Sequence, residues 1–277
     1  MDNNKAAFTL SHVSFSYGRK QVFSDLSLSI PEGKITTFIG ANGSGKTTLF
    51  NLMTKNIKPA RGTIFLREGN IAHLRLSDFA QLVAIVHQHN TAPGDITVEQ
   101  LVRYGRFPFH AHRSRMLTAR TFEHANQKTL HQALREEDER MVSWALDVCS
   151  LNEVRTRAIS SLSGGQLQRV WIAMSLAQGS SIVLLDEPTT YLDVRFQLDI
   201  LQLMKTLNNT YGKTIIMVLH DINQAIHYSD HLVALYEGTV LASGAPREVL
   251  SEQLIQQVYG VHLRLAHIDD LPFVVTV

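Results

Sequence analysis

The chain has 277 residues, a formal net charge of +1 and 44% hydrophobic residues, which suits a globular protein with a sizeable core. The near-neutral charge does not favour nucleic acid or anionic lipid as partners. No apolar run approaches the ~18 residues that cross a bilayer, and the N-terminus lacks the apolar region of a secretory signal. We therefore expect a cytosolic chain, in which the single Cys149 is a small buried residue.

Two N-terminal segments with strand periodicity are predicted to pair as an antiparallel edge. Residues 8–15 and 26–30 alternate apolar and polar side chains, and a turn at 18–20 separates them. Tyr17 continues the alternation of the first segment. Its ring is therefore interpreted in one of two ways, as a platform that stacks on a purine base or as the end of an apolar face.

The segment 40–48 reads GANGSGKTT and contains the full phosphate-binding pattern G-x-x-x-x-G-K-[ST]. It follows the β-branched, strand-like stretch 34–39 and precedes the apolar helical stretch 49–53. A strand, a loop and a helix in this order are the context that the pattern requires. The alternative, a glycine-rich turn with an exposed lysine, does not call for this context.

The chemistry of this segment depends on its glycines and on two side chains. Gly40, Gly43 and Gly45 permit backbone angles that turn successive N–H groups toward a phosphate at a positive helix N-terminus. Lys46 is expected to reach the β- and γ-phosphates as a point charge, and the hydroxyl of Thr47 to ligate Mg²⁺. The segment thus predicts a polyphosphate clamp.

A longer buried strand is predicted at 81–86, after a short strand at 62–66. It ends in His87-Gln88-His89, so Gln88 lies at a strand exit. A neutral amide there ligates Mg²⁺, orients a water or merely terminates the sheet, and the residues alone favour the last of these.

The β signal disappears between residues 91 and 149, which predicts a helical insert within an α/β core. Helical periodicity is found at 97–104, 116–134 and 138–149. Four histidines fall in this insert, namely His110, His112, His124 and His131. No cysteine or carboxylate cluster accompanies them at ligand spacing, so a solvated surface is a better interpretation than a metal site.

The segment 162–166, which reads LSGGQ, is predicted to open another helix. Ser163 and Gln166 have the spacing of a capping box, and a helix cap alone is one interpretation. Gly164 and Gly165 favour more than a cap, because glycine in a first turn lets a ligand approach the free N–H donors. This helix start is therefore predicted to be a second anion site.

An almost wholly apolar strand at 181–185 is followed by Asp186 and Glu187. Asp186 is expected to hold Mg²⁺ through its water shell, and Glu187 to polarise an attacking water. Two solvated acids at a strand end are the alternative. A similar strand at 214–219 ends in His220, which either hydrogen-bonds the γ-phosphate or water or is structural.

In this order, the clamp, the 162–166 segment and the sequence LDEPT at 185–189 resemble the ATP-binding subunit of an ABC transporter. The resemblance runs from about residue 8 to the C-terminus. It implies an α/β fold, a P-loop NTPase (RecA-like) core with an antiparallel β edge and an inserted α-helical subdomain. One domain over 1–277 would comprise a catalytic core at about 1–88 and 167–243, a helical subdomain at about 89–166 and a C-terminal extension at about 244–277.

The resemblance also implies roles for individual residues, with ATP and Mg²⁺ as cofactors. The catalytic residues would be Glu187, His220 and Gln88. Asp193 would belong to the D-loop. ATP would be bound by Tyr17, Gly40, Ala41, Asn42, Gly43, Ser44, Gly45, Lys46, Thr47 and Thr48. Residues that contact the ATP of a partner subunit would be Ser163, Gly164, Gly165 and Gln166. The Mg²⁺ ligands would be Thr47, Gln88 and Asp186.

Four more segments are similar to the ATPases of ferric-siderophore, haem and cobalamin importers, namely 104–108, 171–178, 188–193 and 220–225. The sequence GRFP at 105–108 favours an iron-siderophore cargo. This resemblance implies a dimer that closes on ATP, integral-membrane permease subunits, an indirect extracytoplasmic binding protein and a location at the cytoplasmic face of the cell membrane. The stretch 113–137 is longer and more polar than the family suggests.

The alternatives to import are other classes of ATPase. A soluble ABC ATPase that acts as an assembly scaffold, as in iron–sulfur cluster biogenesis, shares the phosphate motifs. A P-loop kinase has no use for the 162–166 segment, and translation-factor ATPases carry two clamps per chain.

A permease-docking surface is predicted around Pro108. Arg106, Phe107 and Phe109 belong to the residue types that are enriched in interface hot spots. An internal packing corner is the alternative.

Overall fold

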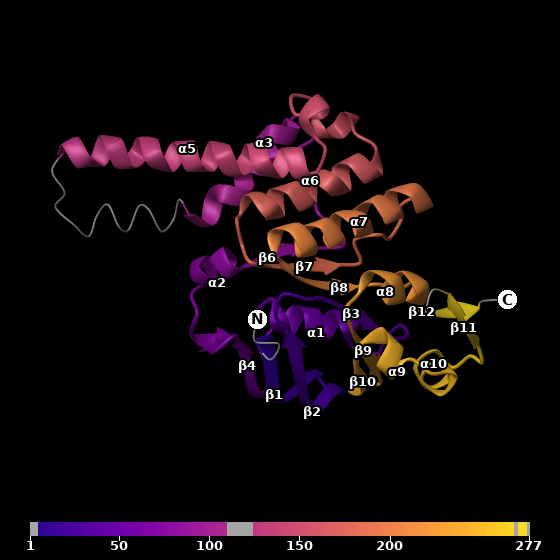
Figure 1. Ribbon diagram of the computed structural model, residues 1–277. Coiled ribbons are helices and arrows are strands. Elements are labelled where there is room, and N and C mark those ends of the chain that lie inside the picture. The colour runs from indigo at the N-terminus through magenta and orange to yellow at the C-terminus, as the bar shows by residue number, and fades with distance from the viewer. Residues whose placement is uncertain (1–4, 110–123, 269–270, 276–277) are drawn as a thin grey trace. The chain divides into compact units, whose positions relative to one another are not determined.

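The computed structural model describes residues 5–109, 124–268 and 271–275 (Figure 1). Packing divides the chain into two compact units. The first comprises Met1–Leu74, Leu184–Thr189 and Met204–Val277, and the second Arg75–Val183 and Thr190–Leu203. The second unit includes residues 167–177, which the sequence placed in the catalytic core, and the expected single ATPase domain stays a prediction. Within the described ranges, no helix is both long and apolar enough to cross a membrane.

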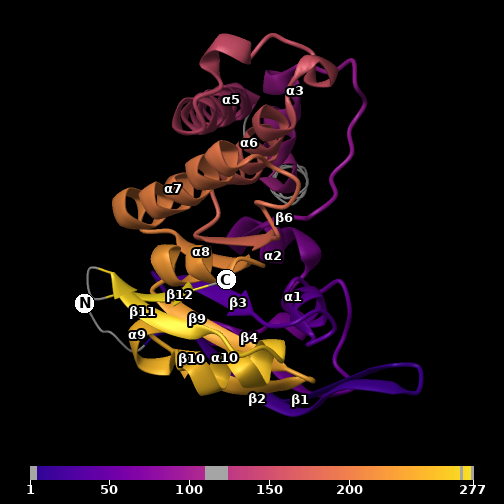
Figure 2. The same cartoon turned by 90° about the vertical axis from the view of Figure 1, so that its right-hand side faces the viewer.

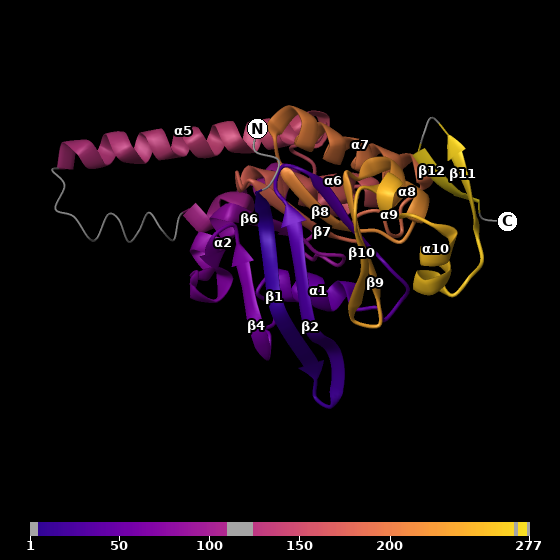
Figure 3. The same ribbon diagram turned by 60° about the horizontal axis from the view of Figure 1, so that its bottom comes forward.

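The first unit contains an antiparallel sheet at the N-terminus. Its strands are β1 (Ala6–Tyr17), β2 (Lys20–Pro31), β4 (Arg61–Leu66) and β5 (Gly69–Asn70). The strand order is β2-β1-β4-β5, and Figure 3 shows β1, β2 and β4 side by side. Both neighbours of β1 run antiparallel to it, which confirms the predicted antiparallel edge.

The first unit also contains a largely parallel sheet with the order β10-β9-β3-β8-β7. Its strands are β3 (Ile35–Ile39), β7 (Ile182–Asp186), β8 (Thr214–Val218), β9 (His231–Tyr236) and β10 (Thr239–Gly244). The first two residues of β7 belong to the second unit and the other three to the first. Strand β3 runs parallel to β8 and β9. Every residue of β3, β7 and β8 is buried, as expected for central strands that are rich in apolar and β-branched residues.

The remaining elements of the first unit are helices and a C-terminal hairpin. They are α1 (Lys46–Met53), η1 (Ile71–His73), α8 (Ile222–Tyr228), α9 (Pro246–Val249), α10 (Glu252–Tyr259), β11 (Arg264–Ile268) and β12 (Leu271–Val275). Strand β12 contacts α8 and α9, and α10 contacts β9. Figure 2 shows these C-terminal elements gathered beside α8 and β9.

The second unit is mainly helical. Its elements are α2 (Leu76–Leu82), β6 (Val83–Val86), α3 (Val98–Arg103), η2 (Tyr104–Arg106), α5 (His124–Val148), η3 (Asn152–Val154), η4 (Ile159–Ser161), α6 (Gly164–Ala177) and the first part of α7 (Val194–Tyr211). Helices α3, α5 and α6 contact one another, as Figure 1 shows. The helical insert that the sequence predicts is present, and Cys149 is buried within it, which raises the pKa of its thiol to about 12.

Two sequence predictions for the second unit need correction. Gln81 and Leu82 belong to the last turn of α2, so the strand that follows is limited to Val83–Val86. The helices predicted at 116–134 and 138–149 are replaced, over the described residues, by the single long helix α5.

The predicted histidine surface falls largely outside the described residues. His110 and His112 lie there, and so do the side chains of His124 and His131. Among the residues that are described, no three His, Cys, Asp or Glu side chains form a metal-holding group.

Arg106 does not lie on a partner-facing surface, which corrects the docking prediction for this residue. Its side chain is 2% exposed, and its Nε donates a hydrogen bond to Asp138 Oδ1 at 2.7 Å. One terminal N–H donates to the Ala177 carbonyl at 2.9 Å, and the guanidinium lies 4.2 Å from the Phe109 ring centroid. The internal packing corner is the correct interpretation for Arg106, whereas Phe107 is 71% exposed.

Candidate functional site

The phosphate-binding segment connects β3 to α1 with the backbone angles that its glycines permit. Gly40, Gly43 and Gly45 have φ of 153°, 82° and 108°. A Cβ at Gly40 would lie 2.4 Å from the Leu235 carbonyl oxygen, so no other residue fits there without a shift. Helix α1 starts at Lys46, and its N-cap residue Gly45 provides no side-chain cap. Its first N–H groups, which no cap satisfies, are the donors that an anion needs.

Lys46 is buried within this loop. Its Nζ donates hydrogen bonds to the carbonyl oxygens of Gly40, at 2.7 Å, and Ala41, at 3.0 Å. Burial lowers the pKa of this ammonium, while the nearby charges of Glu187 and Asp186 act in the opposite direction. The desolvated cation would gain from a negatively charged ligand, because two neutral carbonyls replace its hydration shell only in part.

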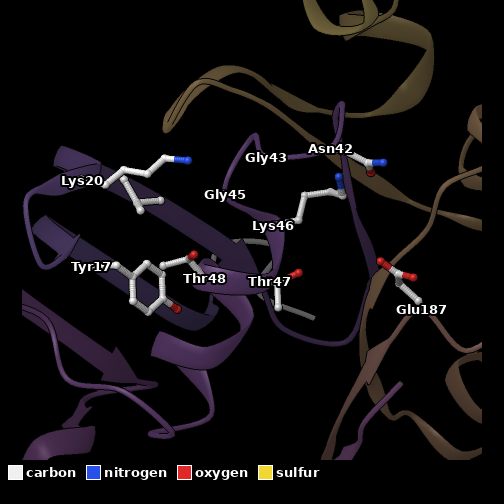
Figure 4. Close-up of a pocket in the computed structure, with 10 residues that line it drawn as sticks. Tyr17, Lys20, Asn42, Gly43, Gly45, Lys46, Thr47, Thr48 and Glu187 are labelled. Atoms are coloured by element: carbon white, nitrogen blue, oxygen red, sulfur yellow. The ribbon is translucent and has the colours of Figure 1, made fainter. Parts of the chain in front are cut away.

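A cavity of about 220 Å³ lies along the loop. Figure 4 shows Tyr17 and Lys20 at one end, Glu187 at the other, and the residues of the loop between them. Tyr17 is half exposed and meets Phe15 edge to face, so its ring both ends the apolar face of β1 and lines the cavity. Lys20 was not predicted as a site residue, although it belongs to the predicted turn directly after Tyr17.

Glu187 and His220 form a pair that the sequence did not predict. Glu187 follows β7 with a left-handed φ of 52°, and His220 follows β8, the neighbouring strand in the sheet order. His220 Nε2 lies 2.6 Å from Glu187 Oε1. Because the Glu187 side chain is only 12% exposed, this contact holds its carboxylate in one orientation at the end of the cavity.

Asp186 provides the oxygen atoms that a hard cation would need. Burial raises the pKa of its carboxyl to about 6, with a further contribution from the charge of Glu187. Within the part of the chain that the structure describes, its buried Oδ1 has no hydrogen-bond partner. A buried carboxylate oxygen without a partner, in the same unit as the exposed Thr47, fits Mg²⁺, which prefers carboxylate and hydroxyl oxygens.

The other predicted site residues, Gln88, Ser163–Gln166 and Asp193, belong to the second unit. Their roles toward ATP stay predictions. Ser163 caps α6 in a capping box, in which the Gln166 N–H donates to Ser163 Oγ and the Ser163 N–H to Gln166 Oε1. A Cβ at Gly165 would lie 2.6 Å from the Phe196 ring, so packing against α7 is one reason for this glycine. Asp193 is exposed just before α7.

Comparison with known proteins places these features among transport ATPases. Residues 23–190 match the family model described as ABC transporter. The iron(3+)-hydroxamate import ATP-binding protein FhuC of Bacillus subtilis is 41% identical over 255 residues, which cover 92% of this chain and 88% of that protein. The ferric enterobactin transport ATP-binding protein FepC of Escherichia coli is 39% identical over 270 residues, covering 98% and 92%.

Solved structures agree with this fold. The structure of cbiO1 from Clostridium perfringens, part of the ABC transporter complex cbiONQ, is similar with a TM-score of 0.71 and 25% identity. The match covers 91% of this chain and 93% of that one. The α/β P-loop NTPase fold that the sequence predicted is thus confirmed.

Proposed function

The chain belongs to the ABC transporter family, and on this premise we propose that it is the ATP-hydrolysing subunit of an importer for iron-siderophore chelates. One observation carries the ATPase mechanism, namely that Glu187 lines the end of the cavity along the phosphate loop while its carboxylate contacts His220. The names of the two relatives support the cargo, since one imports iron(3+)-hydroxamate and the other transports ferric enterobactin.

Nucleotide binding would follow from the geometry of the first unit. The backbone N–H groups of residues 43–48 and the ammonium of Lys46 would hold the β- and γ-phosphates, and the base would lie toward Tyr17. Lys46 would exchange its bonds to the Gly40 and Ala41 carbonyls for bonds to phosphate. Thr47 and Asp186 would hold Mg²⁺, which would supply positive charge against the phosphates, and Gln88 stays a predicted ligand.

Hydrolysis would depend on Glu187. Its carboxylate would accept a proton from the water that attacks the γ-phosphorus. The imidazole of His220 would donate its Nε2–H to Glu187 Oε1, which keeps the other carboxylate oxygen directed toward that water. The left-handed backbone at Glu187 turns the side chain into this position at the strand end.

The predicted site residues of the second unit would serve contacts with partner proteins. Ser163–Gln166 would contact ATP bound to a second copy of the chain, so that two copies close on two ATP molecules, and Asp193 would belong to the D-loop. Integral-membrane permease subunits would hold the dimer at the cytoplasmic face of the membrane, and a binding protein outside the membrane would deliver the chelate. Haem or cobalamin import, and a soluble scaffold role, are the alternatives.

Lys46→Ala is expected to weaken ATP binding by at least about tenfold, because it removes the full positive charge that would face the phosphates. Titration with a fluorescent ATP analogue measures the affinity. Lys34→Ala is the control, since Lys34 directly precedes β3 in the same unit but does not line the cavity. Unchanged affinity and turnover in Lys46→Ala would contradict the clamp.

Phe107→Asp is expected to abolish association with the permease and uptake of ferric siderophore, while the isolated subunit still hydrolyses ATP. Tyr104 on η2 is 56% exposed, and Phe107, which directly follows η2, is 71% exposed; exposed aromatic side chains of this kind are typical interface anchors. The measurements are co-purification with membrane proteins and uptake of a labelled ferric siderophore. Leu241→Asp on the edge strand β10 is the matched control, because Leu241 is exposed in the other unit.

A soluble scaffold would behave differently in this experiment. With a soluble scaffold, no permease would co-purify with the wild-type chain, and Phe107→Asp would leave the set of co-purified proteins unchanged. That outcome would contradict the importer proposal and leave the ATPase chemistry intact.

A further inference from the structure

Helix α8 follows His220 directly, and it is too short to be stable without contacts from outside. It spans the seven residues Ile222–Tyr228, and its cap is Asp221, whose side chain accepts a hydrogen bond from the Gln224 N–H at 2.8 Å. Isolated helices of this length are unstable in water, so their position depends on what they pack against. The contacts of α8 therefore fix the start of this helix, two residues after His220.

One such contact is made by Asn223 in the first turn of α8. Its Nδ2 donates a hydrogen bond to the Val274 carbonyl at 2.9 Å, and its Oδ1 accepts one from the Val274 N–H at 2.8 Å. The side-chain amide thus pairs with both backbone groups of one residue in β12, as a neighbouring strand would. Val274 is fully buried, so neither of these backbone groups has water as a replacement partner.

Strand β12 is a firm support because the C-terminal segment is anchored at several points. It pairs along its length with β11, and the Leu265 N–H of β11 donates to Glu252 of α10 at 3.0 Å. Helix α10 buries Leu254, Ile255 and Val258.

The same segment reaches the start of the phosphate loop through Tyr259. Burial raises the pKa of its phenol to about 12, and the Gly40 N–H faces the phenol oxygen. This oxygen is buried and makes no hydrogen bond of normal geometry with the described residues, so Tyr259 contributes mainly packing here. The C-terminal segment therefore adjoins the loop that would bind phosphate as well as the helix that carries Asn223.

We propose that Asn223 is a positioning residue for ATP hydrolysis, which holds α8 against β12 and thereby keeps His220 in contact with Glu187. This inference rests on the proposed function, since it assumes that the Glu187–His220 pair assists the attack of water. No residue of the C-terminal segment needs to touch ATP. The C-terminal segment would act only by preserving the 2.6 Å contact between His220 and Glu187, which a small movement of α8 would break.

Asn223→Asp is the sharpest variant, because it keeps the size of the side chain and replaces the Nδ2 donor by an oxygen that faces the Val274 carbonyl. We expect kcat for ATP hydrolysis by the full chain to fall on the order of tenfold, with KM changed less than about twofold. Asn223→Ser introduces no charge, and the same direction is expected. Melting of both variants is followed by circular dichroism to establish that they are folded.

A double-mutant cycle separates positioning from a merely structural role. If Asn223 acts through His220, then Asn223→Asp should have no further effect on kcat in a His220→Ala background. The matched control is Asn208→Asp. Asn208 also holds two backbone carbonyls of the same unit, those of Gly33 and Lys213, and its loss should lower the melting temperature without lowering kcat.

Two results would overturn the inference while leaving the proposed function in place. The first is that Asn223→Asp leaves kcat unchanged. The second is that Asn223→Asp lowers kcat by the same factor in the His220→Ala background as in the wild-type chain. If His220→Ala itself keeps the full rate, the role of His220 fails, and the inference fails with it. The proposed function is distinguished from both by the effect of Glu187→Gln, which does not depend on α8.

Discussion

Glu187→Gln is expected to lower the rate of ATP hydrolysis by about 10²–10⁴, the usual contribution of a general base, while ATP still binds. The substitution keeps the size of the side chain, and the amide oxygen still accepts a hydrogen bond from His220. It removes the basic oxygen that would take the proton from water. Single-turnover hydrolysis with bound ATP measures the chemical step without product release.

Glu237→Gln provides a matched control for this experiment. Glu237 is also a glutamate of the first unit with a left-handed backbone, at φ 44°, but it does not line the cavity. Its substitution should leave the rate unchanged. A near-wild-type rate for Glu187→Gln, with normal affinity for ATP, would remove Glu187 from the role of base and leave the attacking water without an acceptor in this proposal.

Features that depend on local sequence could be predicted well. Strands β3, β7 and β8 are buried on both faces, and their apolar and β-branched residues can be recognised without any knowledge of the neighbouring strands. The phosphate loop and the capping box at Ser163 are local in the same sense, because Lys46 bonds to the Gly40 and Ala41 carbonyls, and Ser163 pairs with Gln166 three residues away. Their existence and place were therefore confirmed.

Features that depend on distant pairing were missed for a physical reason. The contact between Glu187 and His220 requires that β7 and β8 be neighbours, which neither strand's composition indicates. The boundary at Leu82, where α2 ends and β6 begins, also depends on a distant residue. The side chain of Gln178 donates hydrogen bonds to the Ala80 and Val83 carbonyls at this boundary. An apolar run alone does not locate such a boundary.

Arg106 shows the same limit most clearly. Beside aromatic residues, its type favours an interface, and the partner that buries it is Asp138, 32 residues away in α5. Gly105 before it is also fixed by a distant contact, since a Cβ there would lie 2.0 Å from the Met174 carbonyl oxygen of α6. The turn 104–106 is thus pressed against α6, which directs Arg106 inward and leaves Phe107 outside.

Arg106→Leu is accordingly expected to destabilise the protein by about 3–5 kcal/mol, because it leaves the carboxylate of Asp138 buried without its cationic partner. Denaturant unfolding of the isolated chain measures this loss as a lower midpoint. Phe107→Asp is the neighbouring comparison, and its effect should stay within about 0.5 kcal/mol because the side chain is exposed.

The double variant Arg106→Leu with Asp138→Leu tests the cause of the loss. Replacing both charges by apolar side chains removes the buried carboxylate together with its cationic partner, so much of the stability should return. The Ala177 carbonyl still loses the N–H donor of Arg106, and recovery should therefore be incomplete. If Arg106→Leu instead keeps its stability and loses permease association, Arg106 acts at the interface after all, and the buried pair with Asp138 does not stabilise the second unit.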